Sequence, residues 1–136
     1  MVPVNQDQEI EITIEGYGHD GEGVGRFQDF TVFVPGALKG ETVKVRVTLV
    51  KKAYAKGKLM KVLNAAAERV TPNCPIFNLC GGCQIQHLDY RAQLELKRQR
   101  VIDALERIGG LKGVQVHATI GMKDPWRYRN KVQYPV

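Results

Sequence analysis

The stretch "ETVKVRVTLVKK", residues 41–52, decides the fold class of the first half of this 136-residue chain. Its apolar side chains alternate with polar ones, Val43, Val45, Val47 and Leu49 on one face and Lys44, Arg46 and Thr48 on the other. A period of two is typical of a β-strand with one buried face. The segment therefore predicts a strand whose basic side chains point outward.

Four other segments before residue 66 have a similar strand pattern. They are "EIEITIEGYG" (9–18), a short "GEGVGRF" (21–27), "FTVFVPG" (30–36) and "YAKGKLMKVL" (54–63). Turn-forming residues separate these strands, and no helical pattern lies between them. The fold class we predict is mainly β with an α+β remainder, beginning with a small closed barrel over residues 1–66.

The glycine cluster "GHDGEGVGRF" (18–27) contains Gly21, Gly23 and Gly25 in a GxGxG pattern. Such glycines cradle a phosphate or nucleotide where a strand leads into a helix. Here the following residues, "RFQDFTVFVP", are β-branched and aromatic and predict another strand. We therefore expect a glycine-rich hairpin and reject a cofactor loop.

Charge is unevenly distributed along the chain. Counting Lys and Arg against Asp and Glu gives −6 for residues 1–38, +7 for residues 39–69 and +5 for residues 70–136. Basic density of this kind favours a polyanionic partner, because phosphates neutralised by Lys or Arg release counterions. A solvated basic face is the alternative. The predicted barrel cations are Lys44, Arg46, Lys51, Lys52, Lys56, Lys58 and Lys61.

The segment "CPIFNLCGGCQIQH" (74–87) holds all three cysteines, spaced C-x5-C-x2-C. No apolar run spans a membrane and the start resembles no signal peptide, so we expect a cytoplasmic protein with reduced, metal-binding thiols. If His87 is the fourth ligand, Cys74, Cys80, Cys83 and His87 form a structural zinc site. If the fourth ligand is a distant cysteine, four thiolates suit either zinc or an iron–sulfur cluster. Three buried free thiols are the remaining alternative.

After this segment we predict one helix, beginning near Asp89 and ending at Gly109-Gly110. Its apolar face would consist of Leu94, Val101, Ile102, Leu105 and Ile108. Two strands should follow around a turn at Asp124-Pro125, the second alternating so that Arg127, Arg129 and Lys131 face RNA and Trp126 lies in the core. Because the sequence stops inside that second strand, we expect a fragment of a longer protein.

Three stretches together resemble one known family. "GHDGEGVGRFQDFTVFVPGALKGETVKVRV" (18–47) is similar to the TRAM domain, a small OB-like RNA-binding barrel. "CPIFNLCGGCQIQHLDYRAQLELKRQRV" (74–101) has the C-x5-C-x2-CQ-x2-H-x2-Y pattern of the 23S rRNA (uracil-5-)-methyltransferases. "TIGMKDPWRYRNKVQYPV" (119–136) resembles the start of that family's central domain.

The resemblance implies an activity that this chain holds only in part. Cys74, Cys80 and Cys83 would bind a [4Fe–4S] cluster with a fourth cysteine beyond Val136, and His87 would not be a ligand. The reaction is methyl transfer from S-adenosylmethionine to C5 of a uracil in 23S ribosomal RNA. The catalytic residues and the S-adenosylmethionine-binding domain belong to a C-terminal part absent from this sequence, so the chain alone should be inactive.

The same resemblance sets the expected organisation and partners. Residues 1–66 would be the TRAM barrel, and residues 67–136 the cluster segment and the beginning of the central RNA-binding domain. We expect a monomer with no membrane partner. The aromatics Tyr17, Phe27, Phe33 and Tyr54 are candidates for stacking on unpaired bases, with a place in the core as the alternative for each.

Overall fold

The structure, a computed structural model, describes residues 1–134. The chain divides into two compact units, the first from Met1 to Asp89 and the second beginning at Tyr90. Each unit is described by itself. None of the described helices is long and apolar enough to cross a membrane.

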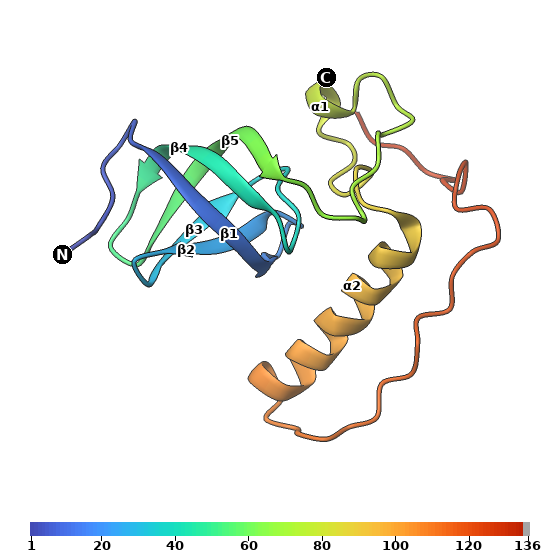
Figure 1. Cartoon of the computed structure of the whole chain (residues 1–136). Coiled ribbons are helices and arrows are strands. Elements are labelled where there is room, and N and C mark those ends of the chain that lie inside the picture. Colours follow the sequence, from blue (N-terminus) through green and yellow to red (C-terminus); the bar gives the residue numbers. More distant parts are fainter. Residues whose placement is uncertain (135–136) are drawn as a thin grey trace. The chain divides into compact units, whose positions relative to one another are not determined.

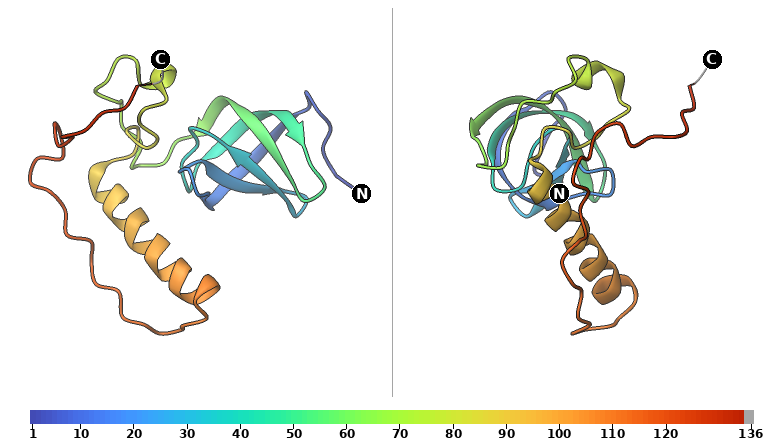
Figure 2. Two further views of the ribbon diagram at one scale, coloured as in Figure 1. Left: turned by 180° about the vertical axis from the view of Figure 1, so that it is seen from behind. Right: turned by 90° about the vertical axis from the view of Figure 1, so that its right-hand side faces the viewer.

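The first unit is built on a barrel of five strands (Figure 1). The strands are β1 (Glu9–Tyr17), β2 (Gly23–Phe27), β3 (Phe30–Val34), β4 (Thr42–Val50) and β5 (Tyr54–Asn64). They close in the order β1-β2-β3-β5-β4, and the curling of the strands around the barrel is visible in the right-hand view of Figure 2. All neighbours are antiparallel except β3 and β5, which pair in parallel. The predicted five-stranded barrel is confirmed.

Short branched side chains fill the barrel. Its buried core includes Ile10, Ile12, Ile14, Val32, Val34, Val43, Val45 and Val47. These residues occupy alternate positions because successive side chains of a strand point to opposite faces. The prediction for Leu49 was wrong: a register shift between Val47 and Leu49 breaks the alternation and leaves Leu49 exposed.

The glycine cluster forms the predicted hairpin between β1 and β2. Gly21 takes a φ of +83°, which a residue with a side chain rarely adopts. Gly25 lies inside the barrel, where a Cβ would come within 2.5 Å of the Thr13 carbonyl oxygen. These glycines therefore serve a turn and a close approach of strands, and none of them begins a helix.

The remainder of the first unit is irregular, apart from the short helix α1 (Phe77–Cys80). Two backbone hydrogen bonds join the two ends of the segment 68–89. Val70 N donates to the His87 carbonyl (2.9 Å), and Asp89 N donates to the Glu68 carbonyl (2.8 Å). They flank an antiparallel bridge between Arg69 and Leu88. The cysteine segment is therefore a loop closed at its base.

The second unit contains the predicted helix. It consists of α2 (Tyr90–Asp103), which continues as one π-helical turn, η1 (Ala104–Ile108), and ends at Gly109. The expected apolar face is only partly covered, since Val101 and Ile108 are exposed. In Figure 1 the following chain returns along this helix.

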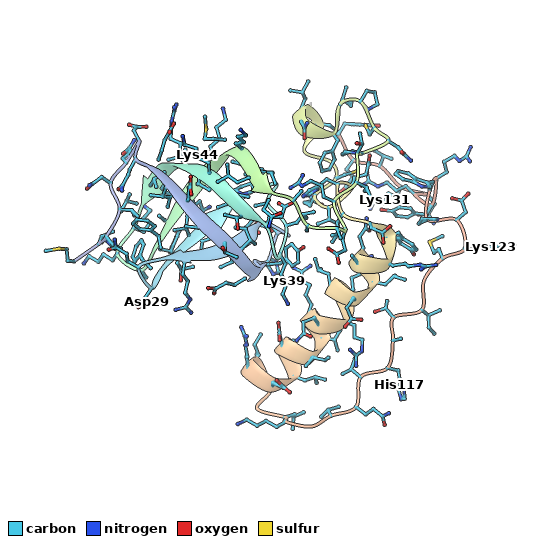
Figure 3. All side chains as sticks on the ribbon, viewed as in Figure 1. Asp29, Lys39, Lys44, His117, Lys123 and Lys131 are labelled. Carbon is cyan, nitrogen blue, oxygen red and sulfur yellow. The ribbon has the colours of Figure 1, made fainter. Side chains whose placement is uncertain are left out.

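The two strands predicted after this helix are absent from the described residues 111–134. A strand needs a partner strand for its backbone groups, whereas the described tail makes isolated hydrogen bonds to the helix. The Arg98 side chain donates to the Val116 carbonyl (3.0 Å), Thr119 donates to the Leu94 carbonyl (2.8 Å), and Met122 N donates to the Tyr90 hydroxyl (2.9 Å). The tail is therefore an irregular chain, on which Figure 3 labels Lys123 and Lys131.

Candidate nucleic-acid interface and cysteine segment

The outer face of β4 and β5 gathers five of the predicted cations. Lys44 and Arg46 lie on β4, and Lys56, Lys58 and Lys61 lie on β5, all at positions that alternate with or follow the buried residues. Arg46 stands directly opposite Lys58, and Lys44 directly opposite Lys61. Like charges facing each other across two strands are destabilising. An anion bound to this face would relieve that repulsion.

A carboxylate from β1 reaches two of these cations. The Glu9 carboxylate accepts hydrogen bonds from the ammonium group of Lys44 at 2.9 Å and from the guanidinium group of Arg46 at 3.1 Å. The hydrogen bond from Lys44, followed by that from Arg46, lowers the pKa of Glu9 below its ordinary value. The three side chains are 39–47% exposed, and Lys44 lies on the outside of the barrel in Figure 3.

Two further predicted cations, Lys51 and Lys52, occupy the turn between β4 and β5. Both are exposed, and the Lys51 N–H donates to the Tyr54 carbonyl at 2.9 Å to close the turn. Within residues 1–134, none of the ion pairs involves Lys51, Lys52 or the three lysines of β5. The structure thus brings all the predicted barrel cations onto two neighbouring strands and their connecting turn.

An aromatic pair lies beside these cations. The rings of Phe33 on β3 and Tyr54 on β5 meet edge to face, with centroids 5.5 Å apart. Each alternates with buried residues, so both rings stand on the outer side of the barrel, half-buried. Phe33 is in register with Lys56. This juxtaposition places an aromatic surface next to a positive charge.

The other two aromatic candidates are less available to a ligand. Phe27 packs against the hydrophobic core. The hydroxyl of Tyr17 accepts the Lys39 N–H at 3.0 Å, and partial burial raises the pKa of Tyr17. The structure therefore singles out Phe33 and Tyr54 among the four candidates.

The predicted cations of the tail do not share a strand face. Arg127, Arg129 and Lys131 lie in irregular chain, all exposed, and Arg127 has a positive φ of 55°. Trp126 was expected in the core but is 45% exposed. The alternation predicted for "WRYRNK" fails because no strand forms among the described residues there.

The cysteine segment presents its thiols at the surface. Cys80 and Cys83 are exposed and Cys74 is half-buried, which contradicts the alternative of three buried thiols. Cys80 ends α1, and Gly81 continues in the left-handed conformation with a φ of 69°. At Gly82 a Cβ would lie only 3.2 Å from the Cys80 sulfur. The two glycines therefore permit the tight turn that separates Cys80 from Cys83.

The donor chemistry of this segment fits a metal group. Three soft thiolates suit zinc or an iron–sulfur cluster, and C-x2-C is a compact pair of ligands. Within residues 1–134, no three Cys, His, Asp or Glu side chains are close enough together to hold a metal ion. The residues present thus match such a group in donor type, and the glycines permit a turn between two of the thiols, but the three thiols are not gathered around one point among the described residues.

His87 faces away from solvent rather than toward an exposed thiol. Its side chain is 4% exposed and packs against Phe77, with ring centroids 5.3 Å apart. Both ring nitrogens are buried without a hydrogen-bond partner among the described residues. The Gly36 carbonyl raises the pKa of His87 slightly, against the larger effects that lower it. Burial, with the positive charge of Arg69 as a second cause, lowers the pKa of His87.

The most buried charge of the first unit was missed by the sequence reasoning. Glu41 is fully buried. Its carboxylate accepts hydrogen bonds from Nε of Arg69 at 2.6 Å, from Nη2 of Arg69 at 2.9 Å and from the Leu38 N–H at 2.9 Å. Burial raises the pKa of Glu41, but these donors outweigh it and hold that pKa below its ordinary value. Arg69 also donates to the Gly36 carbonyl at 2.7 Å. This ion pair joins the start of β4 to the base of the cysteine segment.

Comparison with known proteins finds one domain family in the barrel and relatives that match the whole chain or nearly all of it. Residues 3–60 match the TRAM domain family. An uncharacterized RNA methyltransferase of Halalkalibacterium halodurans is 50% identical over 136 residues, 100% of this chain and 30% of that protein. One from Clostridium tetani is 48% identical, over 99% of this chain and 29% of that protein. A solved structure, the Pyrococcus abyssi tRNA (uracil-54, C5)-methyltransferase with S-adenosyl-L-homocysteine, is 33% identical over 74% of this chain and 21% of that one, with a TM-score of 0.49.

The chain spans about 30% of the length of the curated relatives it matches. The TRAM match covers β1 to β4 and most of β5. The match to the protein of Halalkalibacterium halodurans covers the whole chain, including the cysteine segment and the helix. Residues 3–60 therefore form a TRAM domain, and the chain as a whole is similar to a part of these RNA methyltransferases.

Proposed function

We propose that this chain is the RNA-binding and [4Fe–4S]-binding part of an S-adenosylmethionine-dependent methyltransferase that modifies C5 of a uracil in 23S ribosomal RNA. The relatives support the reaction class, and the C-x5-C-x2-CQ-x2-H-x2-Y pattern supports the choice of base and substrate. In this proposal the catalytic and S-adenosylmethionine-binding residues lie outside the chain, which by itself transfers no methyl group. We place the protein in the cytoplasm, as a monomer with no membrane partner.

The observation that carries the RNA-binding role is the outer face of β4 and β5, which we call the basic face. It consists of Lys44, Arg46, Lys56, Lys58 and Lys61, continued by Lys51 and Lys52 in the turn. Phe33 and Tyr54 border it with a half-buried aromatic pair. Phosphates bound by lysine and bases stacked on aromatic rings are the two elements of single-strand recognition. The role of Arg127, Arg129 and Lys131 in RNA binding rests on charge alone.

A salt titration tests this role. We expect the chain to bind an unstructured oligouridylate, with a plot of log Kd against log salt whose slope corresponds to about 0.7 per phosphate contacted. Four contacts would give a slope of roughly 3. An affinity that does not change with salt would contradict binding through the basic face.

The metal proposal assigns Cys74, Cys80 and Cys83 as cluster ligands, with a fourth cysteine outside the chain. When bound, the cluster would cross-link a loop in which Cys80 and Cys83 are otherwise exposed and Cys74 is half-buried, with metal–thiolate bonds setting its conformation. Iron and sulfide content, measured after anaerobic reconstitution, tests this assignment. Cys83→Ser should lower both contents strongly, whereas the matched His87→Leu variant should keep both. Loss of iron from the His87→Leu variant alone would contradict the assignment.

A zinc site of three cysteines and His87, in a stand-alone RNA-binding module, is the alternative. It would require the His87 ring to leave its buried contact with Phe77. Metal content again separates the two, because this alternative predicts zinc without sulfide and its loss on His87→Leu.

A further inference from the structure

Glu9 is an acidic residue at the border of the basic face. It extends from β1, and its register partner on β4 is Arg46. One oxygen binds Lys44 and the other binds Arg46, so a single carboxylate bridges two cations. These are two of the residues that the proposed function assigns to RNA.

The geometry of this contact is that of an anion-binding site. Ammonium and guanidinium groups donate to a phosphate through the same hydrogen bonds that they offer a carboxylate. On the other side of β4, Lys61 stands opposite Lys44 and Lys58 stands opposite Arg46, so each of the two donors also has a lysine as its neighbour on β5. Glu9 supplies one negative charge to the two cations that it binds, which leaves the group with a net positive charge.

We propose that Lys44 and Arg46 form a phosphate-binding site for the RNA backbone, and that Glu9 occupies this site in the free chain. A phosphate and the Glu9 carboxylate then compete for the same donors. This inference rests on the proposed function, because it requires RNA to bind the basic face. Exposed ion pairs are weak and exchange with solvent ions, so Glu9 can be displaced.

Two consequences distinguish competition from a merely structural ion pair. Removing the carboxylate should raise RNA affinity, because the phosphate no longer displaces an internal partner. It should also steepen the salt dependence, because Lys44 and Arg46 then hold counterions that RNA binding releases. A carboxylate that only positions the two cations predicts the reverse for affinity, since its loss would leave both side chains less ordered.

Glu11 provides a matched control. It lies two residues along β1 on the same exposed face, in register with Lys44. It takes part in none of the ion pairs found in residues 1–134. Glu9→Gln and Glu11→Gln therefore remove the same charge from the same surface, and only the first removes an ion pair with Lys44 and Arg46.

The experiment measures binding of the full chain to a labelled oligouridylate across a range of salt concentrations, with thermal unfolding confirming that each variant is folded. We expect Glu9→Gln to bind about threefold more tightly than Glu11→Gln, with a steeper salt slope. In a Lys44→Gln/Arg46→Gln background the two variants should bind alike.

The outcomes separate the two proposals. If the wild-type chain does not bind RNA, the proposed function fails. If the wild type binds but Glu9→Gln equals Glu11→Gln, or binds more weakly, competition by Glu9 is wrong while the proposed function stands.

Discussion

Arg69 binds the fully buried carboxylate of Glu41 with two of its nitrogens, at 2.6 and 2.9 Å. This contact spans 28 residues of sequence and fastens the base of the cysteine segment to the barrel. The Ala66 N–H also donates to Glu41, at 3.3 Å. The Glu41 carboxylate thus accepts several of the hydrogen bonds that hold the base of the cysteine segment against the barrel.

Removing the guanidinium should destabilise the first unit strongly. Arg69→Ala leaves the Glu41 carboxylate buried without its cation, which costs about 3 kcal/mol in the free energy of unfolding. Arg26→Ala breaks an exposed pair with Glu15 at 3.7 Å and should change that free energy by less than about 0.5 kcal/mol. Urea denaturation measures both. Equal losses in the two variants would show that burial of the pair has no energetic consequence.

The buried His87 predicts a pH dependence of stability. Its pKa in the folded chain lies below the ordinary value of 6.5, so the unfolded chain binds the proton more readily. The stability contributed by this group is therefore complete above pH 6.5 and is lost as the pH falls from there toward the folded pKa.

His87→Leu removes both the titration and two unpartnered buried nitrogens. It should raise the free energy of unfolding by roughly 1 kcal/mol at neutral pH, and by more in mildly acidic solution. Chemical denaturation at several pH values measures this difference, with the exposed His19→Gln as the control. A variant whose pH profile runs parallel to that of the wild type would refute the role given to His87.

Close packing at a glycine of β5 gives a prediction for the barrel itself. A Cβ at Gly57 would overlap the side chain of Val45, whereas a Cβ at Gly16 would meet no atom within 4 Å. Gly57→Ala should therefore destabilise the barrel by about 1–3 kcal/mol through overpacking, and Gly16→Ala should not. Thermal unfolding of the two variants is the measurement. A barrel that tolerated both substitutions equally would contradict the strand spacing at this point.

The aromatic surface predicts a preference for unpaired bases. Replacing Phe33 and Tyr54 together by Leu should weaken binding of an oligouridylate by at least about 1 kcal/mol, because a stacked base loses its platform. Duplex RNA of equal length is the matched control, since its bases are already stacked within the helix. Equal losses for single-stranded and duplex RNA would assign these rings to folding rather than to base stacking.

The strands of the barrel could be predicted because each carries its own alternation. Val43, Val45 and Val47 are buried as their spacing requires. The alternation along β4 did not predict that Leu49 is exposed, because the register shift beside it depends on how β4 pairs with β5. Neighbouring strands, rather than local sequence, decide that phase.

The site was predicted only in part for a similar reason. Lys56 and Lys58 could be placed on the outer face from sequence, but the bridging of Lys44 and Arg46 by Glu9 joins residues more than thirty positions apart. The Glu41–Arg69 pair has the same long-range character. In the tail, alternation suggested strands, yet the hydrogen bonds of residues 116, 119 and 122 go to α2. An alternating sequence therefore predicts a strand even where no neighbouring strand is present to pair with it.

The central claim is that the basic face of the barrel binds RNA. It is tested most directly by the salt dependence of oligouridylate binding to Lys56→Gln/Lys58→Gln, compared with Lys97→Gln/Lys112→Gln, which removes two exposed charges from the second unit. We predict that the first variant binds more weakly and that its salt slope falls by about 1.4, whereas the second retains the wild-type slope. Equal slopes for the two variants, or a larger fall in the second, would contradict the account.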